Sequence, residues 1–368
     1  LKLIIMKTFY PFLMLFVSIF TNAQVTPTLY NNLGTDWLYT TFLDKNTNQL
    51  YLCYFEQGTI KKINLNTPNS PSSTVISGLS YPTDITVINN KLYVLEGTSS
   101  LVDDMPIPNT GTLSNFDLSI TNPPKNVLYN NLNAPMRMAA GNGFVITDEN
   151  TIDTEDPDDY GQQIISKWSI TGAPQKTILL TREWQNSDPL NQAFEHFEVV
   201  GNFMYANSYY YNNNDFFHKY NLQNLTLEQT SHVFTETSEP YFSNAPFTFG
   251  IYEDHFFYSN GSGPGSNFRT PLSSPEITTL TQNYSYNEQG VYFYEWEFDA
   301  QGNAYLLGEV YNDNDTYTVF VFKYTKEQLL STQKLSEKQN IAIFPNPTKS
   351  ALNFSQELYD IRVLDMSG

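Results

Sequence analysis

A short acidic stretch offers the most obvious chemistry in this sequence of 368 residues. It reads TDENTIDTEDPDDYG, from Thr147 to Gly161, and its carboxylates include Asp153, Asp156 and Asp158. Carboxylate oxygens are the hard donors that Ca²⁺ prefers. The spacing differs from the D-x-D-x-D-G pattern of an EF-hand loop. The sequence therefore leaves two interpretations open here, a Ca²⁺ site and a solvated insertion between two strands.

A run of aromatic residues, SYYYNNNDFF, is the second candidate. Tyr209, Tyr210 and Tyr211 follow one another in it. Exposed aromatic rings combine an apolar face with a polar tip, which suits stacking on a sugar ring. Tyrosines in strands also pack against neighbours on the adjacent strand. The run is thus either a ligand-binding platform or part of a sheet.

Several classes of site are excluded by the sequence. It contains no G-x-S-x-G motif, no P-loop and no paired-cysteine zinc spacing. The segment Glu195–Glu198 (EHFE) lacks the second histidine of a metalloprotease helix. A net charge of −19 opposes binding to nucleic acid, because few cations are available to replace phosphate counterions. Cys53 is the single cysteine, so no disulfide forms within the chain, and its alternating context predicts a buried thiol.

The elements that position these residues repeat along the chain. A segment of the form apolar, polar, polar, aromatic, polar, apolar recurs, as in LSNFDL and ISKWSI. The fourth position of each copy is Ile63, Phe116, Trp168, Tyr220 or Tyr324, at separations of 53, 52, 52 and 104 residues. The last separation is a double period, and a degenerate copy, NFRTPL, stands in the gap with a proline in its strand.

A second landmark marks every unit of the repeat. A turn-forming stretch precedes an apolar or aromatic pair, and the pairs are Leu50-Tyr51, Leu92-Tyr93, Phe144-Val145, Met204-Tyr205, Phe256-Phe257 and Ala304-Tyr305. Strands alternate or are fully apolar over four to eight residues, without a sustained helical period. Four antiparallel strands in each of six units of about 50 residues indicate an all-β fold, a six-bladed β-propeller.

The pentapeptide LYNNL occurs at Leu29–Leu33 and again at Leu128–Leu132. The second copy belongs to the predicted outer strand of its unit. The first copy precedes the first complete unit, while the sixth unit lacks a fourth strand. We therefore predict that the N-terminal strand closes the ring by completing the last blade, which leaves no widely exposed edge. The propeller is expected to span residues 24–330.

Both ends of the chain carry processing features. Residues 1–23 combine a short basic region, an apolar run of about 12 residues and small residues before Gln24, which predicts a signal peptide too short to span a bilayer. A charged linker is predicted over 331–340. Residues 341–368 follow, with FPNP at Phe344–Pro347 and IRVLDMSG at Ile361–Gly368.

These C-terminal motifs resemble the start of the type IX secretion sorting domain, a small β-sandwich. The resemblance implies export through the periplasm to the outer cell surface or the medium, with the type IX secretion machinery as partner and no membrane span in the mature form. Such domains continue for several more strands, whereas this sequence stops at Gly368.

The repeats also resemble the NHL and gluconolactonase-like group of propellers, in GTIKKINL, GLSYPTDITV and DAQGNAYLLG. Lactonases of that kind hold a divalent metal in the central channel, which implies ligands at the starts of the first strands. Those starts carry Asp84, Arg137, His196 or Glu198, Thr248, and Glu295 or Glu297. Asp84 and Glu198 are the two metal ligands that the resemblance suggests. Arg137 beside them opposes a cation and is a candidate for ligand binding instead.

The expected function is a non-enzymatic surface or secreted binding module for a glycan, peptide or other polymer. A metal-dependent hydrolase or lactonase with its site in the central channel is the alternative. A structural adhesion component is a third possibility. No cofactor is firmly indicated by the sequence, and Ca²⁺ is the one it suggests.

Overall fold

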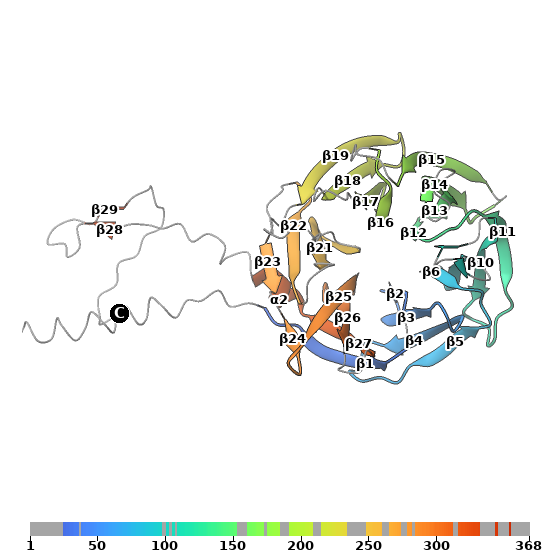
Figure 1. Ribbon diagram of the computed structural model, residues 1–368. Helices are drawn as coiled ribbons and strands as arrows, with labels where there is room; N and C mark the ends of the chain where they lie inside the picture. Colours follow the sequence, from blue (N-terminus) through green and yellow to red (C-terminus); the bar gives the residue numbers. More distant parts are fainter. Residues whose placement is uncertain are drawn as a thin grey trace, which may run out of the picture.

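Strands with apolar faces dominate the computed structural model of this protein, and they assemble into a ring of six sheets (Figure 1). The structure describes residues 25–36, 38–97, 101–102, 105–106, 109–152, 160–172, 175–184, 191–208, 215–233, 248–259, 265–273, 278–281, 284–311, 316–331, 343–344 and 353–354. The predicted signal peptide and most of the predicted sorting segment lie outside these residues.

Each of the six sheets is one antiparallel blade, and the sixth includes the N-terminal strand, so the six-bladed propeller is confirmed. The first three blades contain β2 (Thr40–Asp44), β3 (Gln49–Tyr54), β4 (Thr59–Asn64) and β5 (Ser73–Ser77); β6 (Pro82–Ile88), β7 (Lys91–Glu96), β10 (Gly111–Asp117) and β11 (Asn126–Leu132); and β12 (Met138–Gly141), β13 (Phe144–Ile152), β14 (Tyr160–Ser169) and β15 (Lys176–Glu183). A two-stranded ladder of β8 (Leu101–Val102) and β9 (Met105–Pro106) is inserted between β7 and β10.

The remaining three blades follow the same order. They contain β16 (Phe194–Val200), β17 (Phe203–Ser208), β18 (Asp215–Asn221) and β19 (Thr226–Val233); β20 (Phe249–Tyr252), β21 (His255–Ser259), β22 (Asn267–Pro271) and β23 (Thr278–Thr281); and β24 (Ser285–Tyr286), β25 (Gln289–Phe298), β26 (Ala304–Tyr311), β27 (Tyr317–Tyr324) and β1 (Thr28–Gly34). Pro271 ends its strand, where a missing N–H is tolerated.

The N-terminal strand closes the ring as predicted. β1 pairs antiparallel with β27, from Thr28 opposite Lys323 to Gly34 opposite Val319. It thereby supplies the outer strand of the sixth blade, next to the first blade (Figure 1). The second LYNNL segment lies in β11, the outer strand of the second blade.

The two copies of LYNNL perform the same task at two seams between blades. The Tyr30 hydroxyl donates to the carbonyl of Leu65 in the first blade, and its ring packs edge-on against Tyr305 with centroids 5.2 Å apart. The Tyr129 hydroxyl donates to the carbonyl of Ser169 in the third blade at 3.0 Å, and its ring lies 4.2 Å from that of Trp168. In both copies the tyrosine of the outer strand therefore forms a hydrogen bond to the next blade.

The core is divided into six apolar layers, one in each gap between neighbouring blades. The layer between the second and third blades, for example, joins Leu95 and Leu113 to Met138 and Trp168. The repeated fourth positions Ile63, Phe116, Trp168, Tyr220 and Tyr324 are all buried in these layers. Because each blade buries both of its faces against neighbours, the ring stabilises itself only when all six seams are filled.

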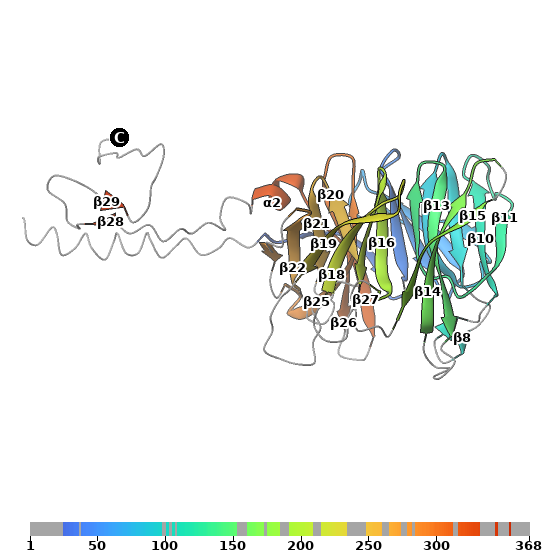
Figure 2. The same cartoon turned by 90° about the horizontal axis from the view of Figure 1, so that it is seen from above.

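Short elements complete the described part of the chain. Helix α2 (Lys326–Ser331) follows β27 and lies at the outer edge of the ring (Figure 2). Its Lys326 Nζ contacts the Tyr252 hydroxyl at 2.9 Å. β28 (Ile343–Phe344) pairs with β29 (Asn353–Phe354) inside the predicted sorting segment. In the described residues, we find no helix with the length and apolar character needed to cross a membrane.

Candidate functional site

The six inner strands surround a central cavity of about 520 Å³. β2, β6, β12, β16, β20 and β25 each contribute lining residues, so the cavity lies on the axis of the ring. A volume of this size matches the pockets that hold small ligands, which are typically ~300–1,000 Å³. We therefore take the cavity as the candidate functional site.

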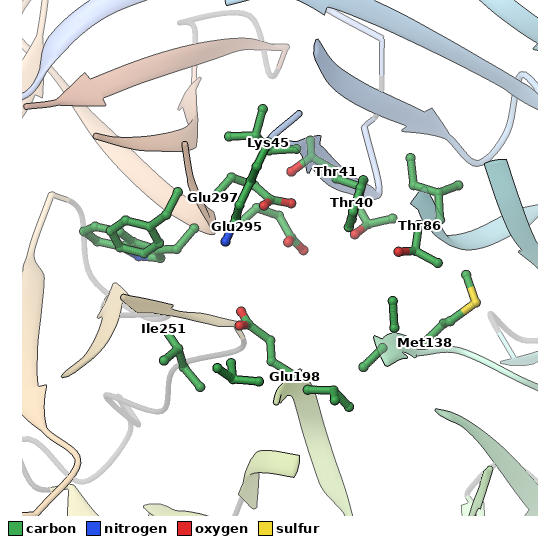
Figure 3. Close-up of a pocket in the computed structure, with 18 of the residues that line it drawn as sticks. Thr40, Thr41, Lys45, Thr86, Met138, Glu198, Ile251, Glu295 and Glu297 are labelled. Carbon is green, nitrogen blue, oxygen red and sulfur yellow. The ribbon is translucent and has the colours of Figure 1, made fainter. Parts of the chain in front are cut away.

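Three glutamates from two separate blades enter this cavity. Glu198 comes from β16, while Glu295 and Glu297 come from β25 (Figure 3). Glu295 sits in a bulge of β25, with a φ of 52° that non-glycine residues rarely adopt. Its N–H donates to Thr248 Oγ1 at 2.8 Å, which helps to hold the bulge. We call Glu198, Glu295 and Glu297 the channel glutamates.

Burial makes the ionised form of the channel glutamates costly. It raises the pKa of Glu198 to about 8, against the opposing effects of Lys45 and of a hydrogen bond from the Ile251 N–H. Burial also raises the pKa of Glu297 well above its ordinary value, and the nearby carboxylates of Glu198 and Glu295 raise it further. Burial therefore favours the protonated form of each channel glutamate, and a positive charge nearby favours the ionised form.

Two further polar side chains line the cavity without a hydrogen-bond partner among the described residues, His196 and Thr86. His196 Nε2 is 3.7 Å from Glu198 Oε1, and its ring packs edge-on against Phe249. Burial lowers the pKa of His196 to about 4, so the imidazole is neutral at pH 7. Thr86 is only 2% exposed, and Figure 3 shows its hydroxyl turned toward the cavity.

Asp84, the other predicted metal ligand, also lines the cavity but its oxygens already have partners. Oδ1 accepts the N–H of Ile85 and Oδ2 accepts the N–H of Met138, each at 2.7 Å. The second bond joins the inner strands of the second and third blades. Burial raises the pKa of Asp84 to about 8, although Arg137 and the two N–H groups oppose the rise. In the described contacts, Asp84 thus links the second blade to the third through its hydrogen bond with the Met138 N–H.

Arg137 lies just before β12, in the same acidic neighbourhood. Its Nε donates to the Glu195 carbonyl at 3.1 Å, and its guanidinium lies 5.7 Å from the centre of the Tyr39 ring. Burial lowers the pKa of Arg137, but Tyr39 and the carboxylates of Glu295, Asp84 and Glu195 together raise it further, so the guanidinium stays charged. Arg137 and Thr248 are not among the residues that line the cavity.

The described residues do not fit a channel metal. Among them, no three His, Cys, Asp or Glu side chains come together in a group that could hold an ion. Asp84 accepts one backbone N–H on each oxygen, and Arg137 adds a fixed positive charge nearby.

The other predicted site residues fall outside the described part of the chain. Asp153, Asp156 and Asp158 belong to the segment between β13 and β14, and Tyr209, Tyr210 and Tyr211 to the segment between β17 and β18. The loop Ca²⁺ site and the aromatic platform stay predictions. The neighbouring Asp148 is buried in β13, where it accepts the N–H groups of Met136 and Arg137, each at 2.8 Å.

Sequence reasoning missed two functional side chains of the cavity, Lys45 and Thr86. Lys45 follows β2 in the turn leading to β3 and lies beside Glu297 and Glu198 in Figure 3. The only feature of the sequence that marks Lys45 is its place in a polar turn, KNTNQ. Thr86 is one of the alternating residues of TDITVI, and no pattern distinguishes a threonine that faces the axis from one that faces a neighbouring blade.

Comparison with known proteins supports the fold and nothing finer. The sequence matches no protein-family model and no curated protein. A luciferin-regenerating enzyme has a similar structure, with a TM-score of 0.54 and 12% identity over 82% of this chain and 95% of that one. A gluconolactonase from Xanthomonas campestris has a TM-score of 0.50 and 11% identity over 80% and 88% of the two chains. At such identities the likeness establishes a shared propeller architecture, while function depends on the site.

Proposed function

We propose that this protein is an exported propeller that binds a small molecule, or the end of a polymer chain, in its central cavity. The observation that carries the proposal is the cavity of about 520 Å³, into which the channel glutamates and the unpartnered Thr86 hydroxyl point. Buried polar groups normally have hydrogen-bond partners. A lining of this kind is therefore complementary to a polar ligand.

The ring suits binding because its inner strands are held from both sides. Asp84 ties β6 to the start of β12, and the Thr248 hydroxyl ties β20 to the bulge of β25. Polar groups fixed by such contacts lose little conformational freedom when a ligand arrives, which strengthens binding. The proposed ligand therefore lies on the axis of the ring rather than at the run of Tyr209, Tyr210 and Tyr211.

A test of binding uses the purified protein and a panel of amines, sugars, short peptides and lactones. Each compound is scored by the rise it causes in the unfolding temperature, since a ligand of the folded state stabilises it. We expect at least one class to raise the temperature, with the rise lost in a double variant Glu198→Gln/Glu297→Gln. The exposed Glu56→Gln is the matched control. Rises that the double variant leaves unchanged for every compound would overturn the proposal.

A channel hydrolase is the second candidate, and the raised pKa values favour it. Glu198 and Glu297 approach the cavity from different blades, and a carboxyl group with a pKa near 8, as in Glu198, can donate a proton to a leaving group. Hydrolysis of a lactone or ester that persists in a metal chelator and disappears in Glu198→Gln would establish this function. Binding without turnover would favour the first.

Export is the other half of the proposal, and it rests on the two ends of the sequence. The predicted signal peptide at 1–23 and the FPNP segment at Phe344–Pro347 support passage to the periplasm and onward through the type IX machinery. Deleting 341–368 in the native host is expected to leave the protein in the periplasm. Equal amounts of the full-length and truncated chains in the medium would refute the sorting role.

A further inference from the structure

We propose that the cavity recognises its ligand through a primary ammonium group held by the channel glutamates, and that Lys45 competes with that group. The inference rests on the proposed function, because it names the ligand class of the same cavity. It concerns an organic cation rather than a metal ion, since the described residues form no group suited to a metal.

The charge of the lining is the first argument. Glu198, Glu295 and Glu297 face one another across the axis (Figure 3), and Asp44 and Glu253 add carboxylates to the lining. Lys45 is the single Lys or Arg among the described lining residues. Acidic side chains therefore outnumber Lys and Arg in the described lining of the cavity, which makes the lining complementary to a ligand that carries positive charge.

The unpartnered Thr86 hydroxyl is the second argument, and it is independent of the acids. Thr86 is 2% exposed and lies on β6, whereas the channel glutamates come from β16 and β25. Its Oγ1 finds no hydrogen-bond partner among the described residues and is turned toward the cavity in Figure 3. A buried hydroxyl of this kind can accept a hydrogen bond from a guest. An ammonium group brings three N–H donors and no acceptor, which matches carboxylate and hydroxyl oxygens converging from three blades.

Lys45 is the third argument, because it already places an ammonium group near the same carboxylates. Its side chain extends from the turn after β2 and, in Figure 3, directs its nitrogen into the space beside Glu297 and Glu198. Its positive charge lowers the pKa of both glutamates. No ion pair within 4.0 Å joins Lys45 to either of them in the described part of the chain, and the residue is exposed. A flexible, solvated lysine can withdraw and leave its place to a ligand ammonium.

The experiment measures binding of 1,5-diaminopentane to the full chain by isothermal titration calorimetry at pH 8. The matched probes are 1,5-pentanediol, which has the same length without charge, and CaCl₂. We expect the diamine to bind and the diol to bind at least tenfold more weakly. The double variant Glu198→Gln/Glu297→Gln is expected to weaken the diamine at least tenfold, since each hydrogen bond to a charged group contributes ~1.5–3 kcal/mol. Lys45→Gln is expected to strengthen it severalfold by removing the competitor.

A pair of threonines provides the control for the hydroxyl. Thr86→Val is expected to weaken the diamine roughly threefold to tenfold, the effect of one hydrogen bond. Thr270 is also buried with an unpartnered hydroxyl among the described residues, but it lies on β22 and does not line the cavity. Thr270→Val therefore reports the cost of the same substitution in the fold and should leave diamine binding unchanged.

Three results would overturn the inference. One is equal affinity for the diol and the diamine, which would indicate a polyol site. Another is stoichiometric Ca²⁺ that the glutamate double variant loses, which would indicate a metal site. The third is a diamine affinity that Lys45→Gln lowers. In the first two cases a ligand still depends on the cavity, so the proposed function would stand. If no probe depends on the channel glutamates, both fail.

Discussion

Truncating Tyr30 to alanine is expected to destabilise the whole propeller, because this residue closes the ring. Tyr30 is 7% exposed and lies in the apolar layer between the sixth and first blades. Its ring contacts Tyr305, its hydroxyl donates to the Leu65 carbonyl, and its own carbonyl accepts the N–H of Asn69. The first two contacts disappear with the side chain, and both join elements that are distant in the sequence.

The magnitude follows from these contacts. Removing a buried aromatic side chain costs ~3–5 kcal/mol, and leaving the Leu65 carbonyl without its donor accounts for ~1–3 kcal/mol of that loss. Tyr30→Phe isolates the hydrogen bond and should cost about 1–3 kcal/mol. For a domain of this size each kcal/mol lowers the unfolding temperature by roughly 2 °C. We therefore expect a fall of about 6–10 °C for Tyr30→Ala.

Thermal and urea unfolding, followed by near-ultraviolet circular dichroism, measure the effect. Thr28→Ala is the control, since Thr28 is exposed on the same strand. Tyr129→Ala should cost less, because Tyr129 is only half-buried, although its hydroxyl also donates to a carbonyl of the next blade. If Tyr30→Ala unfolded at the same temperature as Thr28→Ala, the strand β1 would not be closing the ring in solution, and the account of the repeated LYNNL segment would be wrong.

Two other outcomes follow from the inner strands. Glu198 has a pKa of about 8 in the folded chain against an ordinary value of 4.5, so the folded state holds a proton that the unfolded state releases; the unfolding free energy should fall as pH rises from about 4.5 to 8, and urea titrations should show a shallower fall in Glu198→Gln. Gly250→Ala would place a methyl group 2.8 Å from the Phe298 ring and from Trp296, which should lower stability by ~1–3 kcal/mol and the unfolding temperature with it.

The repeat could be predicted from the sequence because every blade must bury apolar side chains against its neighbours in the same way. The third strand of each blade must bury one large side chain in the layer beside it, and this requirement leaves a period of about 52 residues. Ring closure could be predicted too, since LYNNL needs a neighbouring blade wherever it occurs. Both signals are local and repeated, so chance substitutions at one copy do not erase them.

The cavity could be predicted only in outline. The starts of the inner strands identified His196 or Glu198 and Glu295 or Glu297 as alternatives, yet both members of each pair line the cavity. In each pair the two residues stand two positions apart, and side chains at such positions lie on the same face of a strand. What the sequence does not show is the bulge at Glu295. A bulge is set by partners on other strands and leaves little trace in its own sequence.

The role of Asp84 also depends on a residue that is distant in the sequence. An acid at the start of an inner strand looks like a ligand, but its Oδ2 accepts the N–H of Met138, 54 residues away. The partner that decides its role belongs to another blade. Sequence spacing shows which residues reach the axis, whereas the described hydrogen bonds show which of them are still free to meet a ligand.

Ring closure and the cavity are linked, because the blade that β1 completes also carries two of the channel glutamates. β1 pairs with β27, β27 with β26, and β26 with β25, which bears Glu295 and Glu297. A seam that opens part of the time reduces apparent affinity by the fraction of closed molecules. Tyr30→Ala should therefore weaken diamine binding increasingly as temperature approaches unfolding, while Thr28→Ala does not. An affinity for Tyr30→Ala that equals the wild-type value up to the onset of unfolding would mean that the seam opens only together with the entire ring.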